Sequence, residues 1–205
     1  MRSILGLSAG TLATAVMLTA CTSQADLHCD PPARPETRVS PYDSATATVD
    51  SSTLKICYSR PSAKGRVVFG ELVPLDTLWR TGANEPTILH VSDPGSIAGL
   101  AVEPGSYSIY TVPTSAEWTV VVNASTTQWG LTRDERGPRG VLQPNAYTED
   151  VRAREIGRAQ VRTDSIPFVE QLTIGFSEPS GDQVELWIDW ERTRAIIPIQ
   201  IHPHG

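Results

Sequence analysis

Three segments near the C-terminal end alternate apolar and polar side chains with a period of two. Residues 172–177, 184–190 and 197–201 each place apolar side chains at every second position. Successive side chains of a strand point to opposite faces of a sheet, so this pattern predicts half-buried antiparallel strands. The three- and four-residue spacing of an amphipathic helix is weak throughout the chain.

Shorter apolar and β-branched runs recur between Gly and Pro turn signals in the rest of the chain. Residues 151–161 fit either a short helix or a strand, residues 133–145 have the composition of a long loop, and Pro198 predicts an edge strand because proline cannot donate to a ladder. We expect an all-β fold, an antiparallel β-sandwich of jelly-roll or immunoglobulin-like type with at most one short helix. The expected strands are 53–58, 67–73, 87–92, 106–112, 117–123, 169–177, 183–191 and 195–202.

The first twenty residues have the composition of an export signal. Arg2 precedes an uncharged, mostly apolar run over residues 4–20. The run ends in Leu-Thr-Ala directly before Cys21, and this order resembles the lipobox at which bacterial lipoproteins are cleaved and acylated. We expect Cys21 to be the lipidated residue. An uncleaved membrane anchor and an ordinary secretory signal are the alternatives.

This N-terminus sets the expected organisation and location of the protein. A lipoprotein signal peptide over 1–20 would be followed by a tether over 21–38 and a single β-sandwich domain over 39–205. The acyl chains would anchor the exported domain in the bacterial cell envelope without a membrane-binding surface of its own. Thr22 is not the aspartate that retains lipoproteins at the inner membrane, which favours the outer membrane or the periplasmic face.

Cys29 and Cys57 are the two cysteines that remain after Cys21. An exported chain meets an oxidising compartment, so a disulfide between these two residues is expected, with two independent buried thiols as the alternative. They and the neighbouring His28 lack the paired spacing of a zinc site, so no metal is expected.

Five short motifs in the same order give the middle of the chain a resemblance to a known family. The motifs are YSRPSAKGR (58–66), FGELVP (69–74), WRTGANE (79–85), PGSYS (104–108) and WTV (118–120). They resemble the domain-of-unknown-function family 2911 of bacterial envelope proteins, over about residues 40–198. The resemblance implies an envelope protein without an assigned activity.

Within these motifs, fixed positive charges stand beside a carboxylate and an amide. The guanidinium of Arg80 can hold a carboxylate or a phosphate, and the indole of Trp79 can stack on a sugar ring. In a second, structural interpretation, Arg80 and Glu85 form an internal ion pair, Trp79 lies in the core, and the basic residues belong to a solvated hairpin. The candidate ligand-binding residues are Arg60, Lys64, Arg66, Trp79, Arg80, Asn84 and Glu85.

Charge and motifs restrict the class of function. A formal net charge of −6 argues against a nucleic-acid partner. After the expected signal peptide, residues 21–205 carry no nucleophile elbow, zinc-protease helix, phosphate-binding loop or dinucleotide fingerprint, and no cofactor is expected. We therefore favour a non-enzymatic module that binds a glycan, a cell-wall fragment or a protein through residues 80–85. A hydrolase using carboxylates of the same region and a structural lipoprotein without a ligand pocket are the alternatives.

Overall fold

The computed structural model describes residues 27–30, 38–126 and 148–202. The expected signal peptide, Cys21 and the expected loop over 133–145 lie outside this part of the chain. The described residues form nine strands and one short helix. Within this part of the chain, no helix is long and apolar enough to span a membrane. These elements are β1 (Tyr42–Val49), β2 (Ser52–Ser59), β3 (Ile88–Val91), β4 (Gly95–Ile97), β5 (Leu100–Val102), β6 (Gly105–Val112), β7 (Trp118–Asn123), α1 (Glu149–Arg152), β8 (Glu155–Phe176) and β9 (Gln183–Ile201).

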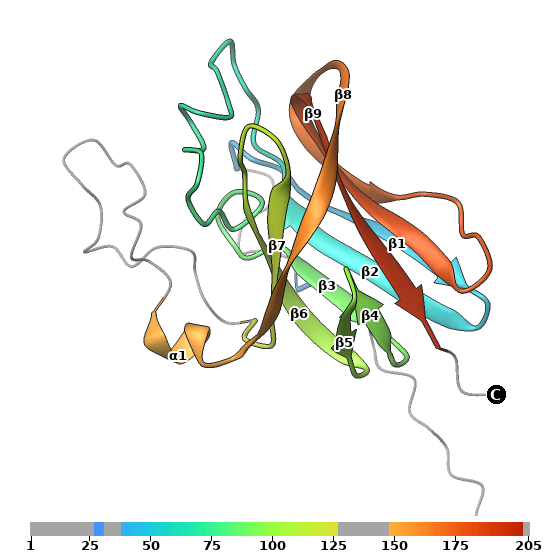
Figure 1. Ribbon diagram of the computed structural model, residues 1–205. Helices are drawn as coiled ribbons and strands as arrows, with labels where there is room; N and C mark the ends of the chain where they lie inside the picture. The colour runs from blue at the N-terminus through green and yellow to red at the C-terminus, as the bar shows by residue number, and fades with distance from the viewer. Residues whose placement is uncertain (1–26, 31–37, 127–147, 203–205) are drawn as a thin grey trace, which may run out of the picture.

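The strands form a continuous antiparallel sheet that folds over into two layers. Their order is β1-β2-β3-β6-β7-β8-β9-β4-β5. The long strand β8 belongs to both layers, because its first part pairs with β7 up to Val161 and its second part pairs with β9 from Arg162 onward. Figure 1 shows β8 leaving the β6–β7 layer and crossing to the layer of β9. The predicted antiparallel β-sandwich is confirmed.

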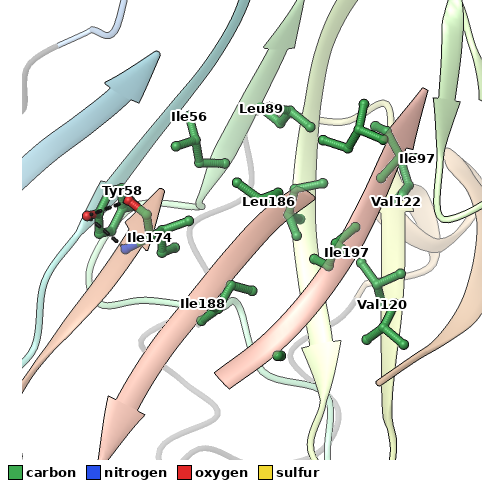
Figure 2. Packing of buried hydrophobic residues seen from close by; sticks show 14 of the residues in the cluster. Ile56, Tyr58, Leu89, Ile97, Val120, Val122, Ile174, Leu186, Ile188 and Ile197 are labelled. Atoms are coloured by element: carbon green, nitrogen blue, oxygen red, sulfur yellow. Dashed lines mark hydrogen bonds between the residues drawn. The ribbon is translucent and has the colours of Figure 1, made fainter. Parts of the chain in front are cut away.

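The core lies between the two layers and is built from the residues that alternate inward. Figure 2 shows Ile56 of β2 and Leu89 of β3 meeting Leu186 and Ile197 of β9. All four are buried, and burial of this kind stabilises the fold by roughly 25 cal/mol per Å² of apolar surface. The C-terminal period-two segments therefore supply one wall of the core.

A buried tyrosine ties the two layers together. The hydroxyl of Tyr58 donates to the carbonyl oxygen of Ile174 at 3.1 Å and accepts from the amide of Ile174 at 2.9 Å (Figure 2). Tyr58 belongs to β2 and Ile174 to β8, so these two bonds link the strands and keep the buried hydroxyl satisfied.

One expected strand is wrong. Residues 67–73 form turns, with a single isolated bridge between Phe69 and Val73. Gly70 adopts a positive φ of 104°, which reverses the chain in the middle of the run. The apolar residues are still used, because Val68 and Val73 are buried in the core.

The C-terminal strand differs from expectation in two ways. The segments expected at 183–191 and 195–202 are one strand, β9, in which Glu191 has a positive φ of 56° and the pairing with β8 shifts register. Pro198 does not mark an edge, because β9 lies between β8 and β4. The amide of Ala98 donates to the carbonyl oxygen of Pro198 at 2.7 Å, directly beyond the last β4 pair, where the missing proline N–H breaks no ladder.

Candidate functional site

The outer face of the first layer, away from the core, carries a group of polar residues. Alternation along β2 and β3 turns Ile56 and Leu89 inward and Cys57 and His90 outward. Along β6 the same alternation turns Tyr110 outward, where it packs in a small second cluster that also contains Val121 and Val151. The site therefore lies on the surface of the sandwich and not between its layers.

A disulfide fixes an N-terminal segment to this face. Cys29 and Cys57 are bonded, with their Cα atoms 5.7 Å apart, as the cysteine count predicted. The bond places residues 27–30 beside β2 and brings His28 and Asp30 to the outer face.

A cavity of about 360 Å³ opens beside this bond, and we call it the disulfide cavity. Its rim combines phenol, imidazole and carboxylate groups with the apolar ring of Pro86. The polar residues that line it are His28, Asp30, Tyr42, Glu85, His90 and Thr126.

Two groups of the cavity have shifted pKa values. Burial raises the pKa of Tyr42 to about 12, and the negative charges of Glu85 and Asp30 add to the increase. Burial and the charge of Lys55 lower the pKa of His90, whose Nδ1 lies 2.8 Å from the hydroxyl of Ser106. A protonated phenol and a neutral imidazole are thus the forms that this cavity stabilises near neutral pH.

Glu85 is held by a residue that the sequence placed in the tether. Nη1 of Arg38 donates to Oε2 of Glu85 at 2.6 Å and also contacts Oε1. The hydroxyl of Ser59 donates to Oε2 at 3.1 Å. Only 18% of the Glu85 side chain and 17% of the Arg38 side chain are exposed, so the pair is largely removed from solvent.

Arg80 stands close to Glu85 without being paired to it. Its Nε is buried and makes no hydrogen bond, and no hydrogen bond or ion pair joins its guanidinium to any residue of the described ranges. Burial lowers the pKa of Arg80, while the charge of Glu85 opposes that effect. Tyr110 also acts on this guanidinium from β6. The internal Arg80–Glu85 ion pair of the structural interpretation is therefore not formed.

The backbone that carries Arg80 and Glu85 is strained. Thr81 and Asn84 both adopt φ values of 59°, in the left-handed region that a β-branched residue such as Thr81 rarely enters. The carbonyl oxygen of Thr81 accepts a hydrogen bond from the hydroxyl of Thr87 at 2.8 Å. The hydroxyl of Thr81 lies 3.1 Å from the hydroxyl of Thr111. Such conformations cost about 1 to 3 kcal/mol each and persist only where surrounding contacts impose them.

Trp79 lies in the core, as in the structural interpretation. It is 4% exposed, its ring stacks on that of Trp190 with centroids 5.8 Å apart, and Nε1 donates to the carbonyl oxygen of Gly82 at 3.3 Å. Phe69 and Trp118 complete this aromatic cluster. No face of the Trp79 ring is left for a ligand to stack on.

The basic residues of the 58–66 motif are used within the protein. Arg60 donates from Nε to the carbonyl oxygen of Leu172 at 3.0 Å, and its other nitrogens reach Asp43 and Thr173 at 2.9 and 3.0 Å. It therefore joins β1 to β8 and is not part of a solvated hairpin.

The two following basic residues of the motif, Arg66 and Lys64, make different contacts. Arg66 donates to the carbonyl oxygens of Ala63 and Ser62, both at 2.8 Å. Lys64 is exposed with a φ of 52°, and its amide donates to Oε1 of Glu170 at 2.8 Å. Of the seven candidates, the structure brings only Arg80, Asn84 and Glu85 together on the loop that precedes β3.

Sequence reasoning missed Arg38, Tyr42, His28 and Asp30. Arg38 is the last residue of the expected tether, and Tyr42 belongs to no motif and to no expected strand. The position of His28 and Asp30 could have been predicted from the sequence. A disulfide from Cys29 to Cys57 requires the residues next to Cys29 to lie beside β2.

Comparisons with known proteins identify a family but no activity. The family model described as "Protein of unknown function (DUF2911)" matches residues 40–199. No curated protein and no solved structure matches the chain. The matched range includes β1 to β8 and nearly all of β9, together with Arg80 and Glu85. The chain therefore belongs to the DUF2911 family of proteins of unknown function.

Proposed function

We propose that this protein is a non-enzymatic binding module that holds an anionic group of a polar ligand, a carboxylate or a phosphate, on the guanidinium of Arg80. The observation that carries the proposal is the buried Nε of Arg80, which has no hydrogen-bond partner. A buried donor left unsatisfied costs about 1 to 3 kcal/mol. Arg80 as a whole is only partly buried, so an anion can approach the rest of the guanidinium and offset part of that cost.

The charges around Arg80 support an anion over a cation. The nearest carboxylate, Glu85, already has one oxygen in contact with Arg38 and the other with Arg38 and Ser59. The positive charge of Arg80 is therefore not matched by a dedicated carboxylate in the described residues. A planar guanidinium binds carboxylate and phosphate through two parallel hydrogen bonds, which gives orientation as well as affinity.

The loop conformation supports a functional role for the same residues. Thr81 and Asn84 flank the turn between Arg80 and Glu85, and both are in the left-handed region. Strained backbone of this kind clusters at ligand sites, because a site is selected for geometry at the expense of stability. Both carboxylate oxygens of Glu85 are already in contact with Arg38 or Ser59. We therefore favour a binding function over a hydrolase that uses this carboxylate.

We further propose that the module is exported and lipid-anchored through Cys21 in the bacterial envelope. The lipobox-like end of the leader supports this location. A glycan, a cell-wall fragment or a protein that presents a carboxylate or phosphate is then the ligand class. Mass spectrometry should find an acylated N-terminal Cys21 and no acylation in Cys21→Ser. An intact leader with an unmodified thiol would remove the anchor from the proposal.

The decisive experiment compares two arginines by the same substitution. Arg80→Met should raise the free energy of unfolding by about 1 to 3 kcal/mol, because it removes an unsatisfied buried donor and keeps the apolar stem. Arg60→Met should lower it by a similar amount, because that guanidinium makes three hydrogen bonds. If Arg80→Met is destabilised as much as Arg60→Met, Arg80 is a structural residue and the proposal fails.

Binding is then measured directly by isothermal calorimetry. The probes are muramyl dipeptide, a cell-wall fragment that carries one free carboxylate, and inorganic phosphate. We expect at least one of them to bind the wild type, with binding lost in Arg80→Met and weakened in Arg80→Lys, which keeps the charge but not the planar fork. Equal binding by the wild type and Arg80→Met would show that Arg80 does not bind the ligand.

A further inference from the structure

The sulfur atoms of the disulfide lie beside an imidazole. Sγ of Cys29, Sγ of Cys57 and a ring nitrogen of His90 are all within 4.8 Å of one another. In the β2–β3 ladder Cys57 is paired with Ile88, so His90 stands diagonally across from Cys57 on the same outer face. Three atoms of the kinds that bind soft metals thus converge at one corner of the disulfide cavity.

We infer that reduction of the Cys29–Cys57 disulfide converts this corner into a Zn²⁺ site with Cys29, Cys57 and His90 as ligands. Thiolate and imidazole are the preferred zinc ligands, at about 2.3 and 2.0 to 2.1 Å in a tetrahedral arrangement. Ligand atoms on one such ion are about 3.3 to 3.8 Å apart. A ring nitrogen of His90 already lies within 4.8 Å of both sulfurs. Once the S–S bond is broken, the two sulfurs, carried on Cα atoms 5.7 Å apart, can separate by side-chain rotation and reach one ion.

His90 already has the kind of hydrogen-bond partner that metal-binding histidines use. Its Nδ1 is hydrogen bonded to Oγ of Ser106 at 2.8 Å, which leaves Nε2 for the ion. Metal-binding histidines usually use their second ring nitrogen for such a bond, because it fixes the tautomer and the direction of the ring.

The same cavity offers the fourth ligand. His28 and Asp30 line it and flank Cys29 in the sequence. An imidazole or a carboxylate from either residue completes a tetrahedral set, and a water molecule does so if neither reaches the ion.

The disulfide and the metal exclude each other. The thiolate is the form that binds metal, and the sulfurs of an intact disulfide carry no negative charge. A dithiol reductant supplies two electrons and two protons, the S–S bond breaks to two thiols, and the reductant becomes a disulfide. Zn²⁺ then displaces the two thiol protons. The ion would hold residues 27–30 against β2 in place of the covalent bond.

The test uses the full chain in a Cys21→Ser background, so that Cys29 and Cys57 are its remaining thiols. Protein reduced with a phosphine is titrated with Co²⁺ and Zn²⁺, since the phosphine takes an oxygen from water and delivers two protons to the sulfurs. We expect one ion per chain, a thiolate-to-cobalt charge-transfer band that Zn²⁺ abolishes, and a rise in the thermal midpoint of the reduced protein. The oxidised protein should show none of these changes.

Two variants of the site and one control variant make the result specific. Ser106→Ala should weaken metal binding by roughly 10- to 100-fold, and His90→Ala should weaken it further. His202→Ala removes an exposed histidine outside the cavity and should bind as the reduced parent does. Metal binding that is equal in oxidised and reduced protein, or unchanged in His90→Ala, would overturn the inference. Arg80 is unaltered in every arm, so this outcome is independent of the anion-binding proposal.

Discussion

Glu85 takes its ion pair from Arg38, 47 residues earlier in the chain, although Arg80 stands in the same loop. The two paired side chains are mostly buried, and Ser59 adds a third contact to the carboxylate. The pair therefore attaches the segment before β1 to the loop before β3 and leaves the guanidinium of Arg80 without a partner among the described residues.

Removing Arg38 should cost more than removing an exposed arginine. We expect Arg38→Ala to lower the free energy of unfolding by about 1.5 to 3 kcal/mol, because it leaves a partly buried carboxylate with only Ser59. Arg162→Ala is the matched control: its contacts to Asp164 and Glu185 are exposed, so the loss should be clearly smaller. Urea denaturation of both variants measures the difference, and equal losses would show that burial of the Arg38 pair has no energetic consequence.

The buried indole of Trp79 should contribute to stability and not to ligand contact. Trp79→Ala should lower the free energy of unfolding by about 3 to 5 kcal/mol, since it opens a cavity beside Trp118 and Trp190. Phe168→Ala serves as the control, because its ring is 49% exposed and its loss should be small. A stable Trp79→Ala protein that has lost only ligand binding would contradict the core assignment.

The disulfide should stabilise the fold through the loop that it closes. For a sequence separation of 28 residues, chain-entropy reasoning gives about 3 to 4 kcal/mol. The double variant Cys29→Ser, Cys57→Ser should therefore unfold at lower denaturant concentration, and metal-free reduced wild type should behave in the same way. Unchanged midpoints in both would mean that residues 27–30 are held by other contacts.

Tyr42 should make the protein less stable in alkali. Its pKa is about 12 in the folded protein, raised from 10.0 first by burial and then by the charges of Glu85 and Asp30, with Arg38 acting in the opposite direction. Below pH 10.0 both states keep the proton, and between pH 10.0 and about 12 the unfolded state releases it first. The free energy of unfolding must therefore fall as the pH rises through this window.

The comparison with Tyr42→Phe isolates this effect from the other tyrosines. The free energy of unfolding of the wild type minus that of the variant should decrease from about pH 9 to about pH 12. Denaturation curves of both proteins at each pH measure it. A constant difference would place the phenol of Tyr42 in contact with solvent.

The sequence predicted the strands most reliably where one face of a strand is buried. The alternation over residues 172–177 and 184–190 leaves one arrangement that hides every apolar side chain, and both segments are strands. The run over 67–73 has a similar composition but turns back at Gly70. Local composition does not reveal such a turn, because the buried residues there are placed by the core around them and not by alternation.

For the site, the sequence by itself determined which residues carry charge near one another in the chain, and it correctly paired Cys29 with Cys57. Only the tertiary structure decided which charge meets which. Arg38 reaches Glu85 because β1 and β2 pair and the loop before β3 folds over them, whereas Arg60 is drawn to Asp43 and the β8 backbone. Ion pairs form between groups that packing brings within a few ångströms, and packing is set by the whole core, so spacing along the chain does not specify them.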